Sequence, residues 1–293
     1  MKLISSKDNP LYKHWYKIAQ GKIKQEVLLE GVHLCQMWLE HYGQPERAII
    51  RWDETQQGMS LERGQVRDSH VFRQETSKTG LATHPSKHAD AQLQDLVQQL
   101  DDNRVCGVSP ALFHALNSVP SPQAILFQVS ITQEQEIPLP VNSAVYLDRI
   151  QDPGNLGTII RTCAAAGIES IYLSPACVNA WGNKVLRSAQ GAHFAVKLYS
   201  QVEAHWFFTH NRLPVYVTHL SERAQSLYAT AFPEHIVWVF GNEGQGVSEE
   251  ISAFADTHIF IPQSEHVESL NVGVACGIAL FEQRRQDLLK SPR

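Results

Sequence analysis

The sequence has few features that would place the chain in a membrane or outside the cell. No apolar run approaches the roughly 18 residues of a membrane helix, and the first ten residues lack the apolar core of a signal peptide. The five cysteines are scattered over 293 residues, and none forms a CxxC pair. Free thiols in a reducing cytoplasm are the expected state, and despite 14 histidines no Cys/His spacing fits a metal site. We therefore expect a cytoplasmic protein without a membrane segment or a metal.

Positive charge is scarce overall but concentrated at the N-terminus. The formal net charge is −5, whereas residues 1–24 contain six lysines and one acidic residue, a local net charge of +5. Tyr12, His14, Trp15 and Tyr16 are interleaved with these lysines. Cations for phosphates and rings for exposed bases are typical of a nucleic-acid surface. An amphipathic helix with a solvated lysine face explains the same pattern, so both interpretations stay open.

Nucleotide-binding fingerprints are also lacking. The chain has no GxGxxG sequence after a strand and no Walker lysine, which argues against a conventional dinucleotide-binding oxidoreductase. Its 43% hydrophobic and 19% charged residues fit a soluble protein long enough for two domains. The segment 131–142 is polar and contains two prolines, as expected for an exposed linker.

The segment before this linker predicts a small α/β domain. The pattern predicts a mobile loop over residues 74–88, rich in Thr, Ser, Lys and His. Helices are expected over residues 10–18, 32–41, 90–100 and 110–116, and strands over 27–29, 48–52, 105–108 and 124–129.

After the linker, strand-like runs alternate regularly with helical stretches. This alternation is typical of a mostly parallel sheet with helices on both faces. The expected strands are 144–147, 170–173, 195–198, 215–218, 236–240 and 258–261, and the expected helices are 156–166, 184–189, 202–209, 249–255 and 269–289.

Three polar blocks follow strands of this second half, where open α/β sheets keep their ligand sites. In the first block, residues 152–161, Asn155 is well placed to cap a helix, and Gly157 allows another backbone to approach closely. Arg161 lies six residues after Asn155, so we expect it to project near the same end. The alternative interpretation of this block is a capped helix with a surface arginine.

The second and third blocks point more clearly to a ligand. Residues 241–248 set Glu243 among three glycines after a buried strand, which suggests that backbone groups meet a ligand directly. A bare turn is the alternative interpretation of this block. In residues 261–286, Ser269 or Asn271 begins a helix whose first part, 272–281, is apolar on every side. Such a helix must be buried all round, by a second subunit or by an enclosing loop.

In order and in spacing, the three blocks resemble the motifs of the SpoU/TrmH family of RNA ribose 2′-O-methyltransferases, in the SPOUT class. The resemblance covers residues 144–289. Residues 4–10 and 29–33 are similar to the ribosomal-protein-like substrate-binding domain of that family. The chain departs from the family pattern at Gln263, where Met is frequent, and at residues 264–266, where the loop often contains glycine.

The resemblance implies an α/β fold with a deep trefoil knot in the mostly parallel sheet of the C-terminal SPOUT domain. Residues 1–130 would form the RNA substrate-binding domain, 131–142 the linker and 143–293 the methyltransferase domain. It also implies S-adenosylmethionine as the cofactor, RNA as the partner, a homodimer and no metal.

The resemblance assigns site residues as well. The catalytic set is Asn155, Arg161, Glu243, Ser269 and Asn271, with Arg161 completing the site across the dimer interface. The cofactor contacts are Gly241, Asn242, Gly246, Ile261, Pro262 and Leu270. RNA contacts are expected from Lys7, Lys13, Lys17 and Arg187.

The implied function is methylation of a ribose 2′-hydroxyl in structured RNA, with ribosomal RNA favoured over transfer RNA because of the separate N-terminal module. A guanidinium has a pKa above about 12, so we favour Arg161 as a phosphate clamp that stabilises developing alkoxide charge, over a role as the base. A SPOUT enzyme that methylates a base nitrogen is one alternative. The other is a non-catalytic RNA-binding protein, which would be expected to have lost Arg161, Glu243 or Ser269.

Overall fold

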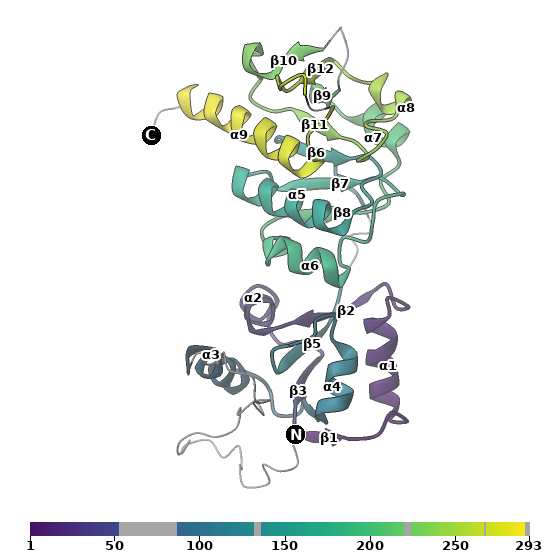
Figure 1. Cartoon of the computed structure of the whole chain (residues 1–293), viewed down its shortest axis with the longest axis vertical. Coiled ribbons are helices and arrows are strands. Elements are labelled where there is room, and N and C mark those ends of the chain that lie inside the picture. The colour runs from purple at the N-terminus through teal and green to yellow at the C-terminus, as the bar shows by residue number, and fades with distance from the viewer. Residues whose placement is uncertain (53–86, 132–135, 220–223, 267, 291–293) are drawn as a thin grey trace. The chain divides into compact units, whose positions relative to one another are not determined.

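The computed structural model describes residues 1–52, 87–131, 136–219, 224–266 and 268–290 (Figure 1). The chain forms two compact units, Met1–Ile131 and Thr132–Arg293. Most of the predicted loop 74–88 lies outside the described residues. Within those residues, no helix has the length and apolar character to cross a membrane, and no group of three His, Cys, Asp or Glu side chains is placed to hold a metal.

The first unit is a five-stranded mixed sheet flanked by helices, in the strand order β1-β4-β3-β5-β2. β5 runs antiparallel to β2 and β3, whereas β4 is parallel to β1 and β3. The short strand β1 was not expected from the sequence. The elements are β1 (Lys2–Ile4), α1 (Pro10–Ala19), β2 (Glu26–Glu30), α2 (Val32–Tyr42), β3 (Arg47–Arg51), α3 (Lys87–Gln98), β4 (Val105–Val108), α4 (Pro110–Leu116) and β5 (Ile125–Ser130).

Helix α1 separates the aromatic residues of the basic N-terminus from its lysines. Tyr12 and Trp15 lie on one face and are buried, and the Trp15 indole donates a hydrogen bond of 2.7 Å to Gln128 Oε1. Lys13 and Lys17 are exposed on the other face. Of the two interpretations of this segment, the amphipathic helix therefore holds for Tyr12 and Trp15, because this unit needs both side chains for its core. Tyr16 is 43% exposed.

The second unit is built on a seven-stranded sheet in the order β10-β12-β9-β11-β6-β7-β8, and all its pairings are parallel. The predicted mostly parallel α/β fold is confirmed. The strands are β6 (Ala144–Leu147), β7 (Ser170–Leu173), β8 (Lys197–Tyr199), β9 (Val215–Thr218), β10 (Gln225–Ser226), β11 (Val237–Phe240) and β12 (Thr257–Phe260). The helices are α5 (Pro153–Ala166), α6 (Asn183–Ala189), α7 (Ala204–His210), α8 (Glu249–Ser252) and α9 (Val272–Lys290), with short 3-10 turns η2 (Ala192–Phe194) and η3 (Leu227–Ala229).

Alternate residues of the central strands face two separate cores. On β6, Val145 and Leu147 pack under α5, α6 and α9, whereas Ala144 and Tyr146 pack with α7 and α8. This pattern of a fully buried strand explains the continuous apolar run in the sequence. The helices cover the two faces of the sheet, so the loops that follow β9, β11 and β12 lie at its carboxyl edge.

One helix start differs from the sequence expectation, and a second one decides between two expected residues. Asp152, not Asn155, caps α5, because its Oδ1 accepts the Asn155 N–H at 2.8 Å and Pro153 supplies the first helical position. The side chain of Asn155 is therefore free for other contacts. Asn271 precedes α9 and caps it, since its Oδ1 accepts the N–H groups of Gly273 and Val274 at 2.9 and 3.3 Å.

Helix α9 is buried on one side only within the single chain. Cys276, Ala279 and Leu280 face the core, but Val274, Phe281 and Leu288 are exposed at 50%, 47% and 50%. These three exposed residues recur every seven positions, so they form one apolar stripe along the helix. No enclosing loop covers the stripe among the described residues of this chain.

Candidate active site

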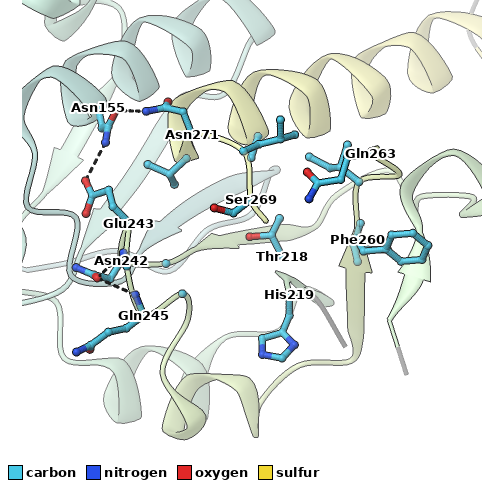
Figure 2. A pocket seen from close by; sticks show the side chains of 18 residues that line it. Asn155, Thr218, His219, Asn242, Glu243, Gln245, Phe260, Gln263, Ser269 and Asn271 are labelled. Carbon is cyan, nitrogen blue, oxygen red and sulfur yellow. Dashed lines mark hydrogen bonds between the residues drawn. The ribbon is translucent and has the colours of Figure 1, made fainter. Parts of the chain in front are cut away.

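A cavity of about 550 Å³ opens at the carboxyl ends of the central strands (Figure 2). This volume lies within the range of small-molecule sites. Its lining comes from the loops after β9, β11 and β12 and from the starts of α5 and α9. The lining residues are Asn155, Thr218, His219, Gly241, Asn242, Glu243, Gly244, Gln245, Gly246, Ile259, Phe260, Ile261, Gln263, Ser269, Leu270, Asn271, Val272 and Ala275.

The glycine-rich loop after β11 forms one wall of the cavity, and its own backbone explains two of its glycines. A Cβ on Gly241 would overlap the backbone of Gly246 and Val247, because the loop closes on itself at this point. Gly246 has φ of 69°, a left-handed conformation that favours glycine. The Asn242 side chain holds the turn, since its Oδ1 accepts the N–H groups of Gly244 and Gln245 at 3.0 and 3.1 Å.

A chain of hydrogen bonds joins the three polar blocks along the edge of the cavity. Asn155 Nδ2 donates to Glu243 Oε1 at 3.0 Å, and Asn155 Oδ1 accepts from Asn271 Nδ2 at 2.8 Å (Figure 2). Glu243 also accepts the backbone N–H of Asp152 at 3.1 Å and, more weakly, that of Gln151 at 3.4 Å. The carboxylate therefore connects the glycine-rich loop to the start of α5, and Asn155 extends the connection to α9.

These contacts set the charge state of Glu243. Burial favours the neutral acid, but the hydrogen bonds from Asn155 and from the backbone outweigh it, so the pKa of Glu243 lies below its ordinary value. Glu243 is accordingly an ionised acceptor at neutral pH and not a general acid. Ionised and acceptor-only, it fixes the Asn155 amide with its nitrogen towards Glu243 and its oxygen towards Asn271.

The structure brings most of the expected site residues together. Asn155, Glu243, Ser269 and Asn271 line the cavity, as do Gly241, Asn242, Gly246, Ile261 and Leu270. Pro262 is not among the lining residues. Ser269 lies between Glu243 and Gln263 in Figure 2, and among the described residues its hydroxyl has no hydrogen-bond partner.

The expected cationic residues lie elsewhere. Arg161 is exposed on α5, without a hydrogen bond or ion pair in the described chain, and it does not line the cavity. The expectation that Arg161 projects near Asn155 into one site is therefore not met within a single chain. Arg187 is exposed on α6, and Lys7, Lys13 and Lys17 belong to the first unit.

Sequence reasoning missed several lining residues. Thr218 is the last residue of β9, and His219 follows it. Gln245 and Phe260 lie in segments whose importance was predicted, but their side chains were not assigned to the site. The order of the strands would have pointed to Thr218 and His219, because β9 lies between β11 and β12. The His219 ring lies edge-on to that of His258 at 5.8 Å, and burial together with His219 lowers the pKa of His258.

Comparisons with known proteins agree with this arrangement of motifs. The model of the SpoU rRNA Methylase family matches residues 142–281. An uncharacterized tRNA/rRNA methyltransferase of Synechocystis is 36% identical over 183 residues, which cover 61% of this chain and 66% of that protein. The 23S rRNA (guanosine(2553)-2'-O)-methyltransferase RlmP of Bacillus subtilis is 28% identical over 298 residues, covering 97% of this chain and 100% of that enzyme.

A solved structure shares the fold over nearly the whole chain. The AdoMet-bound rRNA methyltransferase of Sinorhizobium meliloti superposes with a TM-score of 0.74, covering 97% of each chain. Its sequence identity of 23% limits this likeness to the fold.

Proposed function

The chain belongs to the SpoU family of RNA methylases, and from this premise we propose that it transfers a methyl group from S-adenosylmethionine to a ribose 2′-hydroxyl of ribosomal RNA. The observation that carries the proposal is the hydrogen-bonded chain Glu243–Asn155–Asn271 beside a cavity of about 550 Å³. The names of the relatives favour ribosomal RNA as the substrate, with transfer RNA as the alternative.

The cavity has the chemistry that S-adenosylmethionine requires. Ile259, Ile261 and Leu270 offer apolar surface for an adenine ring, and the glycine-rich loop offers backbone groups for polar atoms. When bound, the cofactor supplies an electrophilic methyl group on a positively charged sulfur. The chain's own residues have to orient the ribose oxygen and favour loss of its proton.

The site residues divide this work between them. Glu243 and Asn271 use one hydrogen bond each to hold the Asn155 amide, whose second N–H and second lone pair remain for a ribose. The Ser269 hydroxyl is also available at the cavity. We assign Asn155, Ser269 and Asn271 to orienting the ribose and Glu243 to holding Asn155 in place.

Arg161 belongs in the proposal as the group that clamps a substrate phosphate and stabilises developing alkoxide charge. Its exposure on α5 is compatible with action in the cavity of a second copy. Supporting features are the apolar stripe Val274, Phe281 and Leu288 on α9, and the contact of α9 with Thr158, one turn before Arg161. We therefore propose a homodimer in which each cavity receives Arg161 from the other chain.

Combining two impaired variants in one dimer tests this arrangement. In a heterodimer of Arg161→Ala and Glu243→Gln chains, one of the two cavities would combine an intact Glu243 with an intact Arg161. Coexpression should then raise methyl transfer well above the level of either variant alone. If Arg161 acts in its own chain, every cavity stays defective and no activity returns.

The proposal also includes a deep trefoil knot in the second unit and a cytoplasmic location. The knot is supported by the path of the chain, since the loops after β11 and β12 reach one cavity and α9 then packs on α5. Relatives with this fold that act on ribosomal RNA support the location. The first unit would grip RNA through Lys7, Lys13 and Lys17, with Arg187 contributing from α6.

The reaction itself is tested by transfer of a radiolabelled methyl group from S-adenosylmethionine to total RNA of cells that lack this protein. The labelled RNA is sized and digested to nucleosides, with the Arg161→Ala protein run alongside. We expect label in one ribosomal RNA species as a 2′-O-methyl nucleoside, and loss of label with the variant. A base-methylated nucleoside, or no transfer to any RNA, would overturn the proposal.

A further inference from the structure

Arg149 is the second residue after β6 and has an unfavourable backbone conformation. Its φ is 56°, in the left-handed region that residues with a Cβ rarely adopt. Among the described residues, only Gln190 and Gln201 share this feature without being glycine. Glycine would adopt the same backbone without strain, so the presence of an arginine indicates that its side chain is needed here.

The Arg149 guanidinium joins a buried carboxylate to the glycine-rich loop. Its Nε and Nη2 donate to the Asp148 carboxylate at 3.1 and 3.3 Å. Its Nη1 donates to Gln245 Oε1 at 2.8 Å, and Nη2 makes a longer contact of 3.4 Å with the Gly246 carbonyl. The fixed fork of donors on arginine allows one side chain to make all these contacts.

Asp148, which accepts from Arg149, is itself held in place by backbone hydrogen bonds. It is only 2% exposed, its N–H donates to the Phe240 carbonyl at 2.9 Å, and its carboxylate accepts the Ser248 N–H at 2.8 Å. Phe240 is the last residue before the glycine-rich loop (residues 241–246), and Ser248 is the second residue after it. Asp148 thus fixes both ends of the loop, and Arg149 fixes its far side.

The loop also depends on the backbone of Arg149. Asn242 Nδ2 donates to the Arg149 carbonyl at 2.9 Å, and the Arg149 N–H donates to Ser174 Oγ at 2.9 Å. Figure 2 shows the Gln245 side chain pointing away from Ser269, and its Oε1 is the atom that accepts from Arg149. Arg149 itself does not line the cavity.

We propose that Arg149 is a positioning residue that holds the loop 241–246 in the form that binds S-adenosylmethionine. The assignment rests on the proposed function, because the loop forms a wall of the cavity given above to the cofactor. Without the hydrogen bonds from Arg149, the loop would populate conformations that cannot bind S-adenosylmethionine. The apparent dissociation constant then rises by the factor by which the competent population falls.

Titration calorimetry of the full-length protein with S-adenosylmethionine tests the assignment. For Arg149→Gly we expect a dissociation constant raised about tenfold, and a raised KM for S-adenosylmethionine with kcat recovered at saturating cofactor. Gln201→Gly is the matched control, because it relieves a comparable left-handed backbone in an exposed loop outside the cavity. It should leave the dissociation constant unchanged.

Arg149→Lys guards against a trivial folding defect, since lysine keeps the charge beside Asp148 but cannot span both loop acceptors. Its affinity should fall between those of wild type and Arg149→Gly, with a melting temperature close to that of wild type. Equal affinity for S-adenosylmethionine in wild type, Arg149→Lys and Arg149→Gly would overturn the assignment of Arg149 but not the proposed function. Failure of the wild-type protein to bind S-adenosylmethionine would instead overturn the proposed function and this assignment with it.

Discussion

Glu243 Oε1 accepts a hydrogen bond from Asn155 Nδ2 at 3.0 Å, although 88 residues separate the two side chains. The contact joins the loop after β11 to the first turn of α5, and Asn271 adds the first turn of α9. An amide is nearly symmetric in shape, so its donor and acceptor ends are distinguished only by its partners. Glu243 is the partner that makes this distinction at the cavity.

Replacing Glu243 with Gln should therefore disable Asn155 without changing the shape of the site. Asn155 and the Asp152 N–H both donate to Oε1, and the Gln151 N–H donates to Oε2. A glutamine amide accepts through one end only, so its NH2 group would face a donor, and the negative charge that strengthens these hydrogen bonds would be lost. We expect kcat for methyl transfer to fall about 100-fold, as small misplacements of orienting groups do, with little change in the dissociation constant for S-adenosylmethionine. Steady-state kinetics and calorimetry measure the two effects separately.

Glu249→Gln provides the matched control, since Glu249 is exposed at the start of α8 and does not line the cavity. It should retain wild-type kcat. A Glu243→Gln enzyme with the same kcat as this control would show that the hydrogen bond to Asn155 does not matter for transfer.

Gly157 should resist substitution because α5 and α6 meet there. A Cβ on Gly157 would overlap the Ser188 Cβ and lie 2.8 Å from the Val185 carbonyl oxygen. We expect Gly157→Ala to reduce the free energy of unfolding by about 1–3 kcal/mol through overpacking, measured by urea denaturation. Gly277→Ala on α9 meets only an ordinary contact of 3.7 Å with Thr162 and should cause no loss. Equal stability of the two variants would contradict the close approach of α5 and α6.

The sequence anticipated what depends on periodicity and strand ends. Buried β6 and β11 read as continuous apolar runs, and the polar blocks at Asn155, Glu243 and Asn271 followed predicted strands closely enough to be assigned to one site. The Asp152 cap was missed because Asp and Asn both suit the position, and Pro153 decided between them.

Other features depend on contacts that no local pattern contains. Trp15 could serve an RNA surface or a core until its hydrogen bond to Gln128, 113 residues away, decided for the core. Arg149 follows β6 without any motif of its own, and its importance emerges only from the buried Asp148 and the distant Gln245. The strand order that places Thr218 at the cavity is likewise a property of the folded sheet.

The three lysines assigned to RNA should affect the salt dependence of binding and not the cofactor. Each phosphate contact adds about 0.7–0.9 to the slope of log K against log salt concentration. Lys13 pairs with Asp8 at 2.9 Å, so Lys7 and Lys17 should account for most of the effect. We expect the variant with Gln at Lys7, Lys13 and Lys17 to show a slope smaller by about 2 in filter binding to ribosomal RNA, with unchanged affinity for S-adenosylmethionine.

Lys197→Gln serves as the comparison for charge alone, since Lys197 is an exposed lysine of the second unit. An unchanged slope in the triple variant would remove these lysines from the RNA surface.

His193 should make the second unit sensitive to mild acid. The His193 side chain is only 1% exposed. Its Nε2 donates a hydrogen bond of 2.7 Å to the Ala180 carbonyl oxygen, whereas its Nδ1 is buried without a hydrogen-bond partner among the described residues. Burial disfavours the charged ring and lowers its pKa to about 4 from 6.5. Between pH 6.5 and 4 the unfolded chain therefore takes up a proton that the folded chain refuses, so stability falls as pH falls through this window. The loss approaches about 3 kcal/mol at the acid end of this window.

The His193→Gln variant tests this, because glutamine keeps a hydrogen-bond donor for the Ala180 carbonyl but does not titrate. It should flatten the pH dependence of the free energy of unfolding, measured by urea titrations from pH 7 to pH 5, where most carboxylates stay ionised. His205→Gln, at an exposed position, should leave the wild-type dependence intact, and the same slope in all three proteins would show that His193 is protonated in the folded state.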